Sequence, residues 1–501
     1  MNAVYKHLIE KYKEIYIISS ISSLLYWDMN TYMPSSALEH RTNQFNWLQQ
    51  TMHKKWTSEK MISLINQCEK DSTLNNVEKR NVILLKRIVE EKIVLPIELV
   101  GQLAIQSNKT LEIWKIAKKK NDFSVVQSEL EKLFALEVKK ANLLAEAKEL
   151  SDPYEALVDS RDPGFTIEIL NNFFSETKNF LVPFVEKCIN SENQPEKSFL
   201  GRFVSRKKQE NVVNELVKFL EYNFQAGRVD EVEHPLTIPC GPQDVRLTVK
   251  YKENEIMKAL LAGSHECGHS LHAQQRNPNW IGQPVNGYTG PSFGESQSRI
   301  LENHITLSPE FWNYYYPKFQ NQTGEFDDIP LNEFYFAISS TQPGPNRIGS
   351  DELTYALHII IRFELERALY SGKIEVVDLP QEWNKKYEQY LGIKVESDTQ
   401  GVMQDLHWYS QYWGYFYGYA MGDIIAAQLI NRGLTRDLPE WHEKLNIGKF
   451  TPIREWLANT IHSKGALYDC LDMVKVITGE SLNVKYFLNY LEKKYTSLYE
   501  L

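Results

Sequence analysis

The sequence has few cysteines and no surplus of positive charge. Its 501 residues include only five cysteines, which are scattered and show no CxxC spacing. Neither a disulfide framework nor a cysteine-based zinc site is therefore indicated, and a reducing cytoplasm is the expected location. Lys and Arg number 56 against 65 Asp and Glu, a net charge of -9. Because nucleic-acid binding needs a basic surface, we expect no nucleic-acid partner.

Long apolar runs are also missing. The most apolar early stretch, from Ile15 to Trp27, contains four serines and is shorter than the roughly 20 apolar residues that a membrane span needs. The N-terminus carries Lys6, Lys11 and Lys13 and has no apolar region followed by a small-residue cleavage site. We therefore expect a soluble protein without a secretion signal or a membrane partner.

What is present is mostly helical periodicity. Segments such as Asn76 to Lys92 and Phe123 to Leu150 carry apolar residues at three- and four-residue spacing without internal Pro or Gly. Strand-like alternation is convincing only between Arg228 and Tyr251, around a turn at Gly241 and Pro242. The chain shows no fixed repeat and no long Gly/Ser linker. We predict one mainly α domain over residues 1–501, with a small β-hairpin or meander.

The strongest chemical signal is an HExxH motif. His265 and His269 are four residues apart in a segment of helical periodicity, so both imidazoles lie on one helix face and can bind the same zinc ion. Glu266 then lies beside the metal, where a carboxylate can act as general base and later as general acid. The alternative is a helix with two surface histidines and no metal.

A third ligand is needed to complete such a site. The continuation found in metzincins requires Gly and His where this chain has His272 and Gln275, so that arrangement is excluded. A downstream glutamate is the alternative, and a second helix opening near residue 294 offers Glu295 or Glu302. Glu295 is favoured because the first turn of a helix tolerates a carboxylate best. Glu302 is then expected to be an interhelical partner.

Together with this motif, several others make the chain resemble the carboxypeptidase Taq family of thermostable zinc metallocarboxypeptidases. They occur in the family's order and span nearly the whole chain: HPL at 234–236 (usually HPF), DVRLT at 244–248 (DxRxT), GESQ at 294–297 (usually HESQ), NRIGSD at 346–351 (loosely IRxxAD) and GVMQDLHW at 401–408 (GxxQDxHW).

The resemblance implies a zinc-dependent carboxypeptidase that removes single C-terminal residues from peptides, with one Zn²⁺ per chain and Co²⁺ as a possible substitute. It implies a large helical metallopeptidase fold with the small β element near the HExxH helix and a deep substrate groove. Residues 1–190 are expected to form a helical, lid-like part over that groove, and residues 191–501 the zinc-site part. It also implies a homodimer with broad substrate acceptance.

Two arginines are candidates for binding the terminal carboxylate of a substrate. Arg347 lies in a Gly- and Pro-rich loop before a long predicted helix, and its guanidinium can grip a carboxylate with two parallel hydrogen bonds. Arg246, in the segment resembling DxRxT, is the second choice. The structural alternatives are an ion pair between Arg246 and Asp244 and a loop-capping role for Arg347.

Five further positions complete the predicted site. Tyr419 and His407 are candidate catalytic residues, because a neutral Tyr or His donor can stabilise the oxyanion that develops on the scissile carbonyl. His234 is a candidate for the same cleft. Gln404 and Asp405 belong to the segment that resembles GxxQDxHW, and they are expected to bind substrate.

Some positions depart from the family pattern. Gly294 stands where the family usually has His, Leu236 stands where it has Phe, and the motif of Arg347 lacks its flanking Ile and Ala. None of the metal ligands changes, so zinc binding is expected to persist, and substrate preference and rate are the properties in which a difference from the family is expected. The alternatives to a carboxypeptidase are an oligopeptidase or dipeptidase, and a peptide-binding protein that has lost activity.

Overall fold

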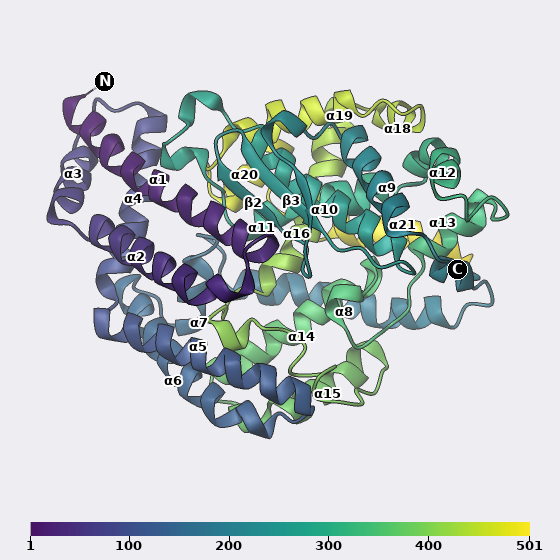
Figure 1. Cartoon of the computed structure of the whole chain (residues 1–501), viewed down its shortest axis with the longest axis horizontal. Helices are drawn as coiled ribbons and strands as arrows, with labels where there is room; N and C mark the ends of the chain where they lie inside the picture. Colours follow the sequence, from purple (N-terminus) through teal and green to yellow (C-terminus); the bar gives the residue numbers. More distant parts are fainter. Residues whose placement is uncertain (1) are drawn as a thin grey trace.

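The computed structural model describes residues 2–501, and its N-terminal third is entirely helical (Figure 1). The two long helices predicted from apolar spacing are confirmed, as is a helix starting near Ile167. The helices are α1 (Ala3–Thr31), α2 (Leu38–Trp56), α3 (Glu59–Glu69), α4 (Asn76–Val94), α5 (Ile97–Lys120), α6 (Ser124–Ala147), α7 (Pro153–Asp159) and α8 (Ile167–Ile189).

A three-stranded sheet follows, made of β1 (Val229–Glu231), β2 (Thr237–Gly241) and β3 (Asp244–Val249), in the order β1-β3-β2. The predicted hairpin is confirmed, because β2 and β3 pair antiparallel. The meander is not found, since β1 pairs parallel with β3 and not with β2. One face of the sheet packs against the helix that carries the HExxH motif, and the other against α1.

The remaining chain is again helical and confirms the mainly α fold class. Its helices are α9 (Arg206–Phe219), α10 (Ile256–Gln274), α11 (Pro291–Arg299), α12 (Pro309–Thr323), α13 (Leu331–Ser339), α14 (Glu352–Tyr370), α15 (Leu379–Leu391), α16 (Tyr417–Gln428), α17 (Thr435–Asp437), α18 (Trp441–Asn446), α19 (Thr451–Trp456), α20 (Cys470–Thr478) and α21 (Lys485–Tyr499). A π-helical segment, Ile300–Thr306, continues α11. In residues 2–501 no helix has the length and apolarity to cross a membrane.

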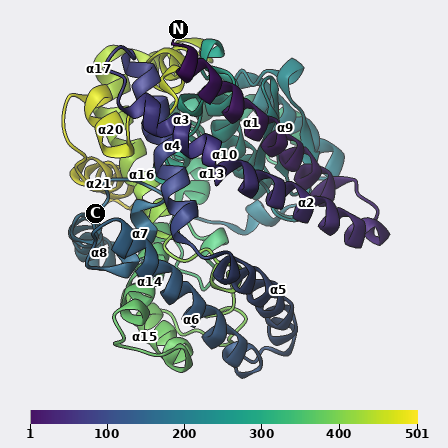
Figure 2. The same cartoon turned by 90° about the vertical axis from the view of Figure 1, so that its left-hand side faces the viewer.

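The two largest of four hydrophobic clusters form most of the core in the described residues. The larger core runs from α5 to the C-terminal helix and surrounds α10, α11 and α16. A separate, smaller core, which includes Leu8, Ile65 and Leu85, holds α1, α3 and α4 together. Figure 2 shows the α1–α2 pair and the α5–α6 pair as two arms on the same side of the molecule. The division of the chain at residue 190 and the substrate groove stay predictions.

Candidate metal centre

The two histidines of the HExxH motif lie on α10, as predicted. His265 and His269 are one turn apart, and their ring centroids are 5.0 Å apart. Gly268 between them permits close packing on α11, because a Cβ there would lie 2.4 Å from the backbone oxygen of Gln297. The glycine inside the motif therefore allows α10 to lie close to α11, the helix that carries Glu295, the third predicted ligand.

Glu295 completes the cluster from α11. Its Oε2 lies 3.5 Å from His269 Nε2 and 3.9 Å from His265 Nε2. One ligand atom from each of these residues lies within 4.8 Å of the others. The helix begins at Pro291, earlier than expected, so Glu295 lies in its second turn and not at its N-terminal end. Two imidazoles and one carboxylate form a donor set that suits a divalent metal with an open coordination position.

Glu302, the rival ligand, lies behind His265. Its Oε2 is 2.8 Å from His265 Nδ1, which leaves the Nε2 atom of that ring facing Glu295. A carboxylate that accepts a hydrogen bond from the second nitrogen of a ligating imidazole fixes its tautomer and orientation. The geometry thus gives Glu302 the interhelical role and groups Glu295 with the histidines.

Arg299 joins these carboxylates, and the sequence interpretation missed it. Its Nε donates to Glu295 Oε1 and its Nη1 to Glu302 Oε2, both at 3.0 Å. Asp423 of α16 lies 3.5 Å from Arg299 Nε, and the guanidinium stacks over the Tyr355 ring at 4.2 Å. The spacing of Glu295, Arg299 and Glu302 on one helical stretch was the available signal, since residues three and four apart are neighbours on a helix.

The cluster is strongly electronegative. Burial lowers the pKa of His265, but the neighbouring carboxylates of Glu295 and Glu302 outweigh it and raise the pKa to about 9. Burial likewise raises the pKa of Glu295, yet His265 and Arg299 hold it well below its ordinary value. Glu295 is therefore ionised throughout the neutral range, as a metal ligand must be.

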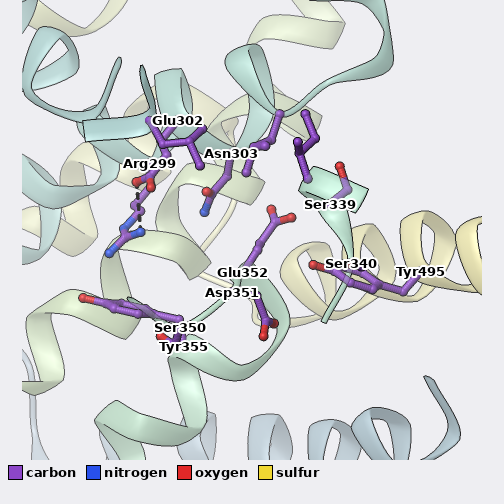
Figure 3. A pocket seen from close by; sticks show the side chains of 13 residues that line it. Arg299, Glu302, Asn303, Ser339, Ser340, Ser350, Asp351, Glu352, Tyr355 and Tyr495 are labelled. Atoms are coloured by element: carbon purple, nitrogen blue, oxygen red, sulfur yellow. Dashed lines mark hydrogen bonds and ion pairs between the residues drawn. The ribbon is translucent and has the colours of Figure 1, made fainter. Parts of the chain in front are cut away.

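A pocket lined by both polar and apolar side chains lies on the other side of the Arg299–Glu302 pair. Figure 3 shows Arg299 and Glu302 joined at one wall and Ser339 at another, with Glu352 between them. Neither histidine of the motif nor Glu295 lines this pocket. It therefore adjoins the residues behind the metal ligands and is not part of the ligand cluster itself.

Glu266 follows His265 on α10 and contacts the sheet. It is buried, and its Oε2 accepts a hydrogen bond of 2.7 Å from the hydroxyl of Thr237 on β2. The same hydroxyl lies 2.8 Å from the Glu266 backbone oxygen. Thr237 was not predicted, because the contact joins residues 29 positions apart. One carboxylate oxygen is thereby anchored, and Oε1 makes no hydrogen bond within residues 2–501.

Arg347 lies just before α14 in a second buried cluster. Its Nε and Nη2 donate to Asp405 Oδ1 at 3.1 and 2.8 Å, and its Nη1 donates to the Tyr355 hydroxyl at 3.2 Å. Gln404 Oε1 accepts from the Arg347 backbone N–H at 2.9 Å. Arg362, which was not predicted, donates from Nε to Asp405 Oδ2 at 2.7 Å. Three predicted residues therefore lie together, with a second arginine beside them.

His407 and Tyr419 adjoin this cluster. His407 Nε2 lies 3.2 Å from the Tyr419 hydroxyl, and the Arg347 guanidinium lies 5.0 Å from the centre of the Tyr419 ring. Burial lowers the pKa of His407 to about 3, with Arg347 adding to the effect. Burial raises the pKa of Tyr419 well above its ordinary value, and the nearby Glu295 carboxylate contributes. Both side chains are therefore uncharged at neutral pH.

The other two predicted residues are not part of these clusters. Arg246 forms two hydrogen bonds of 2.8 Å with Asp244 on the same strand and stacks over Trp27 of α1 at 4.2 Å. This is the local ion pair named as its structural alternative. His234 lies between β1 and β2, is exposed, and makes no side-chain hydrogen bond in the described part of the chain.

Comparisons with known proteins point to one family. A family model described as carboxypeptidase Taq (M32) metallopeptidase matches residues 7–495. Carboxypeptidase 1 of Bacillus subtilis is 36% identical over 498 residues, with 99% of each chain covered. Thermostable carboxypeptidase 1 of Thermus thermophilus is 31% identical over 512 residues, again with 99% of each chain covered.

Solved structures agree with these sequence matches. The M32 carboxypeptidase of Deinococcus radiodurans superposes with a TM-score of 0.96 at 30% identity, covering 100% of both chains. The carboxypeptidase of Pyrococcus furiosus superposes with the same TM-score at 28% identity, covering 99% of both chains. The similarity therefore includes the helical arms as well as the ligand cluster.

Proposed function

This chain belongs to the carboxypeptidase Taq (M32) metallopeptidase family, and from that premise we propose that it is a zinc-dependent carboxypeptidase that releases single C-terminal amino acids from peptides. The observation that carries the proposal is the convergence of His265, His269 and Glu295, with Glu266 next to His265 on the same helix. Two imidazoles and a carboxylate match the ligand preference of zinc, and one ion per chain is expected, with Co²⁺ as a possible substitute.

Bound zinc supplies Lewis-acid polarisation of the scissile carbonyl and lowers the pKa of water. Glu266 takes a proton from the attacking water as general base and delivers it to the leaving amine as general acid. The hydrogen bond from Thr237 holds one oxygen of the carboxylate, which leaves Oε1 available for this transfer. Glu302 and Arg299 orient His265 and Glu295 from behind.

Arg347 is the proposed partner of the substrate's terminal carboxylate. Asp405 pairs with both Arg347 and Arg362, so the three side chains together carry an excess of one positive charge. Gln404 fixes the backbone of Arg347 through its side-chain carbonyl. A buried guanidinium with residual positive charge favours a free carboxylate over an amide. Arg246 and His234 are second choices for contacts with substrate.

Tyr419 is proposed to donate a hydrogen bond to the oxyanion that develops during hydrolysis, with His407 as its neighbour. Both groups are uncharged, and a neutral donor fixed in a buried site stabilises developing charge without reorganisation. The hydrogen-bond distance between His407 and Tyr419 supports a joint role. We further propose a cytoplasmic location, which the scattered cysteines favour. From the family resemblance we expect a homodimer that accepts a broad range of peptides.

The test uses one peptide and its C-terminally amidated twin, each incubated with the zinc-loaded protein and followed by mass spectrometry. We expect stepwise loss of single C-terminal residues from the free acid and little or no cleavage of the amide. Equal cleavage of both peptides would assign the chain to the oligopeptidases or dipeptidases instead. No cleavage by metal-loaded protein would favour a peptide-binding role.

A further inference from the structure

The helix that carries Glu295 is enclosed by its neighbours. Every residue of α11 from Ser292 to Arg299 is buried, and α10 and α16 pack directly against it. On α16, Gly418 and Gly422 are four residues apart and therefore lie on the same helix face. Both glycines face α11, since the atoms nearest to each belong to that helix.

Gly422 is in contact with the metal-ligand residue itself. A Cβ at this position would lie 2.5 Å from Glu295 Cγ, 2.8 Å from its Cβ and 3.2 Å from its backbone carbon. Carbon atoms in favourable contact are about 3.5 to 4.0 Å apart. Because the nearest atoms belong to the base of the side chain, rotating the carboxylate does not relieve the overlap. An added methyl group must displace Glu295.

The carboxylate group of Glu295 has little freedom to move in response to such a displacement. Its Oε1 is held by Arg299 Nε at 3.0 Å, and its Oε2 lies close to His265 and His269. Metal-ligand distances tolerate changes of only about 0.2 Å. A displacement of Cγ therefore moves the ligand oxygen by more than the metal-ligand distance tolerates.

From this geometry we propose that Gly422 is a positioning residue: by carrying no side chain, it lets α16 approach α11 and fixes Glu295 in its ligating position. The inference rests on the proposed function, because it takes Glu295 as a metal ligand. It goes beyond that function by assigning a role in metal binding to a residue that itself offers no ligand atom.

Gly418 supplies a matched control on the same face. A Cβ at Gly418 would meet Ser292 Oγ at 3.4 Å, Ser292 N at 3.6 Å and Pro291 Cβ at 3.8 Å, which are ordinary contacts. Gly418→Ala and Gly422→Ala thus add the same methyl group to the same helix face. Only the methyl group added by Gly422→Ala overlaps with Glu295.

The experiment measures Co²⁺ binding to metal-free wild-type, Gly418→Ala and Gly422→Ala proteins, by competition titration and by visible absorption of the bound cobalt. For Gly422→Ala we expect affinity to fall about 10- to 100-fold, the range typical of altered support around metal ligands, together with a changed cobalt spectrum. Gly418→Ala should keep the wild-type affinity and spectrum. Thermal unfolding of the metal-free proteins should be similar for both variants.

Two results would overturn the inference. The first is wild-type cobalt affinity and spectrum in Gly422→Ala. The second is a metal-free Gly422→Ala protein that unfolds at a markedly lower temperature than metal-free Gly418→Ala, because the overlap would then be relieved by loosening the helices. If the wild-type protein binds no Co²⁺, the ligand assignment of the proposed function is wrong, and this inference fails with it.

Discussion

Leaving the histidines aside, the metal centre carries an excess of negative charge, whereas the cluster around Asp405 carries an excess of positive charge. At the metal centre the carboxylates of Glu295 and Glu302 contact a single arginine, Arg299, while burial raises the pKa of the nearby Asp423 to about 7. Around Asp405 the ratio is reversed, because two arginines share one carboxylate. A bound cation would balance the charge of the first cluster, and a bound anion would balance that of the second.

The two clusters meet at Tyr355. Its ring lies under the guanidinium of Arg299, and its hydroxyl accepts a hydrogen bond from Arg347. One histidine in each cluster shows the difference between them. Neighbouring carboxylates outweigh burial and raise the pKa of His265 to about 9, whereas burial and nearby arginines lower that of His407 to about 3. Surrounding charge therefore decides the protonation of His265, whereas burial is the main cause that keeps His407 neutral.

The largest effect should come from removing a carboxylate of the metal centre. Glu295→Ala deletes a ligand, so we expect loss of the bound metal, measured as zinc per chain after dialysis. Glu302→Ala removes only the partner of His265 Nδ1, and should weaken affinity by about 10- to 100-fold while one zinc still binds at saturation. The reverse result would make Glu302 the ligand.

Glu266→Gln should have the next largest effect. The amide keeps the shape of the side chain but cannot accept the proton, so turnover should fall by about 10² to 10⁴ while zinc content stays normal. Thr237→Val, which removes the hydrogen bond to Glu266 Oε2, should lower turnover less. Steady-state kinetics and zinc analysis of the same samples check both. Normal turnover in Glu266→Gln would move the general base to another residue.

Arg347→Ala tests the positively charged cluster around Asp405. We expect a loss of about 2 to 4 kcal/mol in transition-state stabilisation for free-acid peptides, as for other buried charge pairs, and no remaining discrimination against amidated ones. Asp405 keeps Arg362 as its partner, so folding should be preserved. The measurement is kcat/KM for the acid and amide peptides. Arg246→Ala is the control, and loss of discrimination there would transfer the role to Arg246.

Local pattern was sufficient to predict much of this molecule. Apolar spacing predicted α4 and α6, because a helix buries one face at a fixed period and neither segment contains Pro or Gly. The HExxH spacing and the acidic residues of the following helix predicted the residues that the fold brings together. In each case the relevant residues are close in sequence or carry a known spacing.

Contacts between distant segments were not predictable in this way. The parallel pairing of β1 with β3 depends on how the chain returns after Glu231. The hydrogen bond from Thr237 to Glu266 joins a strand to a helix. Arg362 lies among apolar residues of α14, 43 positions from Asp405, so its sequence surroundings indicated only a buried helix. These residues acquire their roles from packing.

The smallest predicted effect is a pH dependence that the Asp405 cluster imposes on stability. Because burial lowers the pKa of His407 to about 3, the folded state keeps this ring neutral while the unfolded state protonates it near its ordinary pKa of about 6.5. The stabilisation is therefore present above about pH 6.5 and is lost as the pH falls towards 3, by about 2 kcal/mol between pH 7 and pH 5. Denaturant unfolding of His407→Gln should show a pH dependence weaker by this amount than that of the wild type. If the two proteins lose stability equally on acidification, burial in the Asp405 cluster does not keep His407 uncharged, and the contrast between the two clusters does not extend to their histidines.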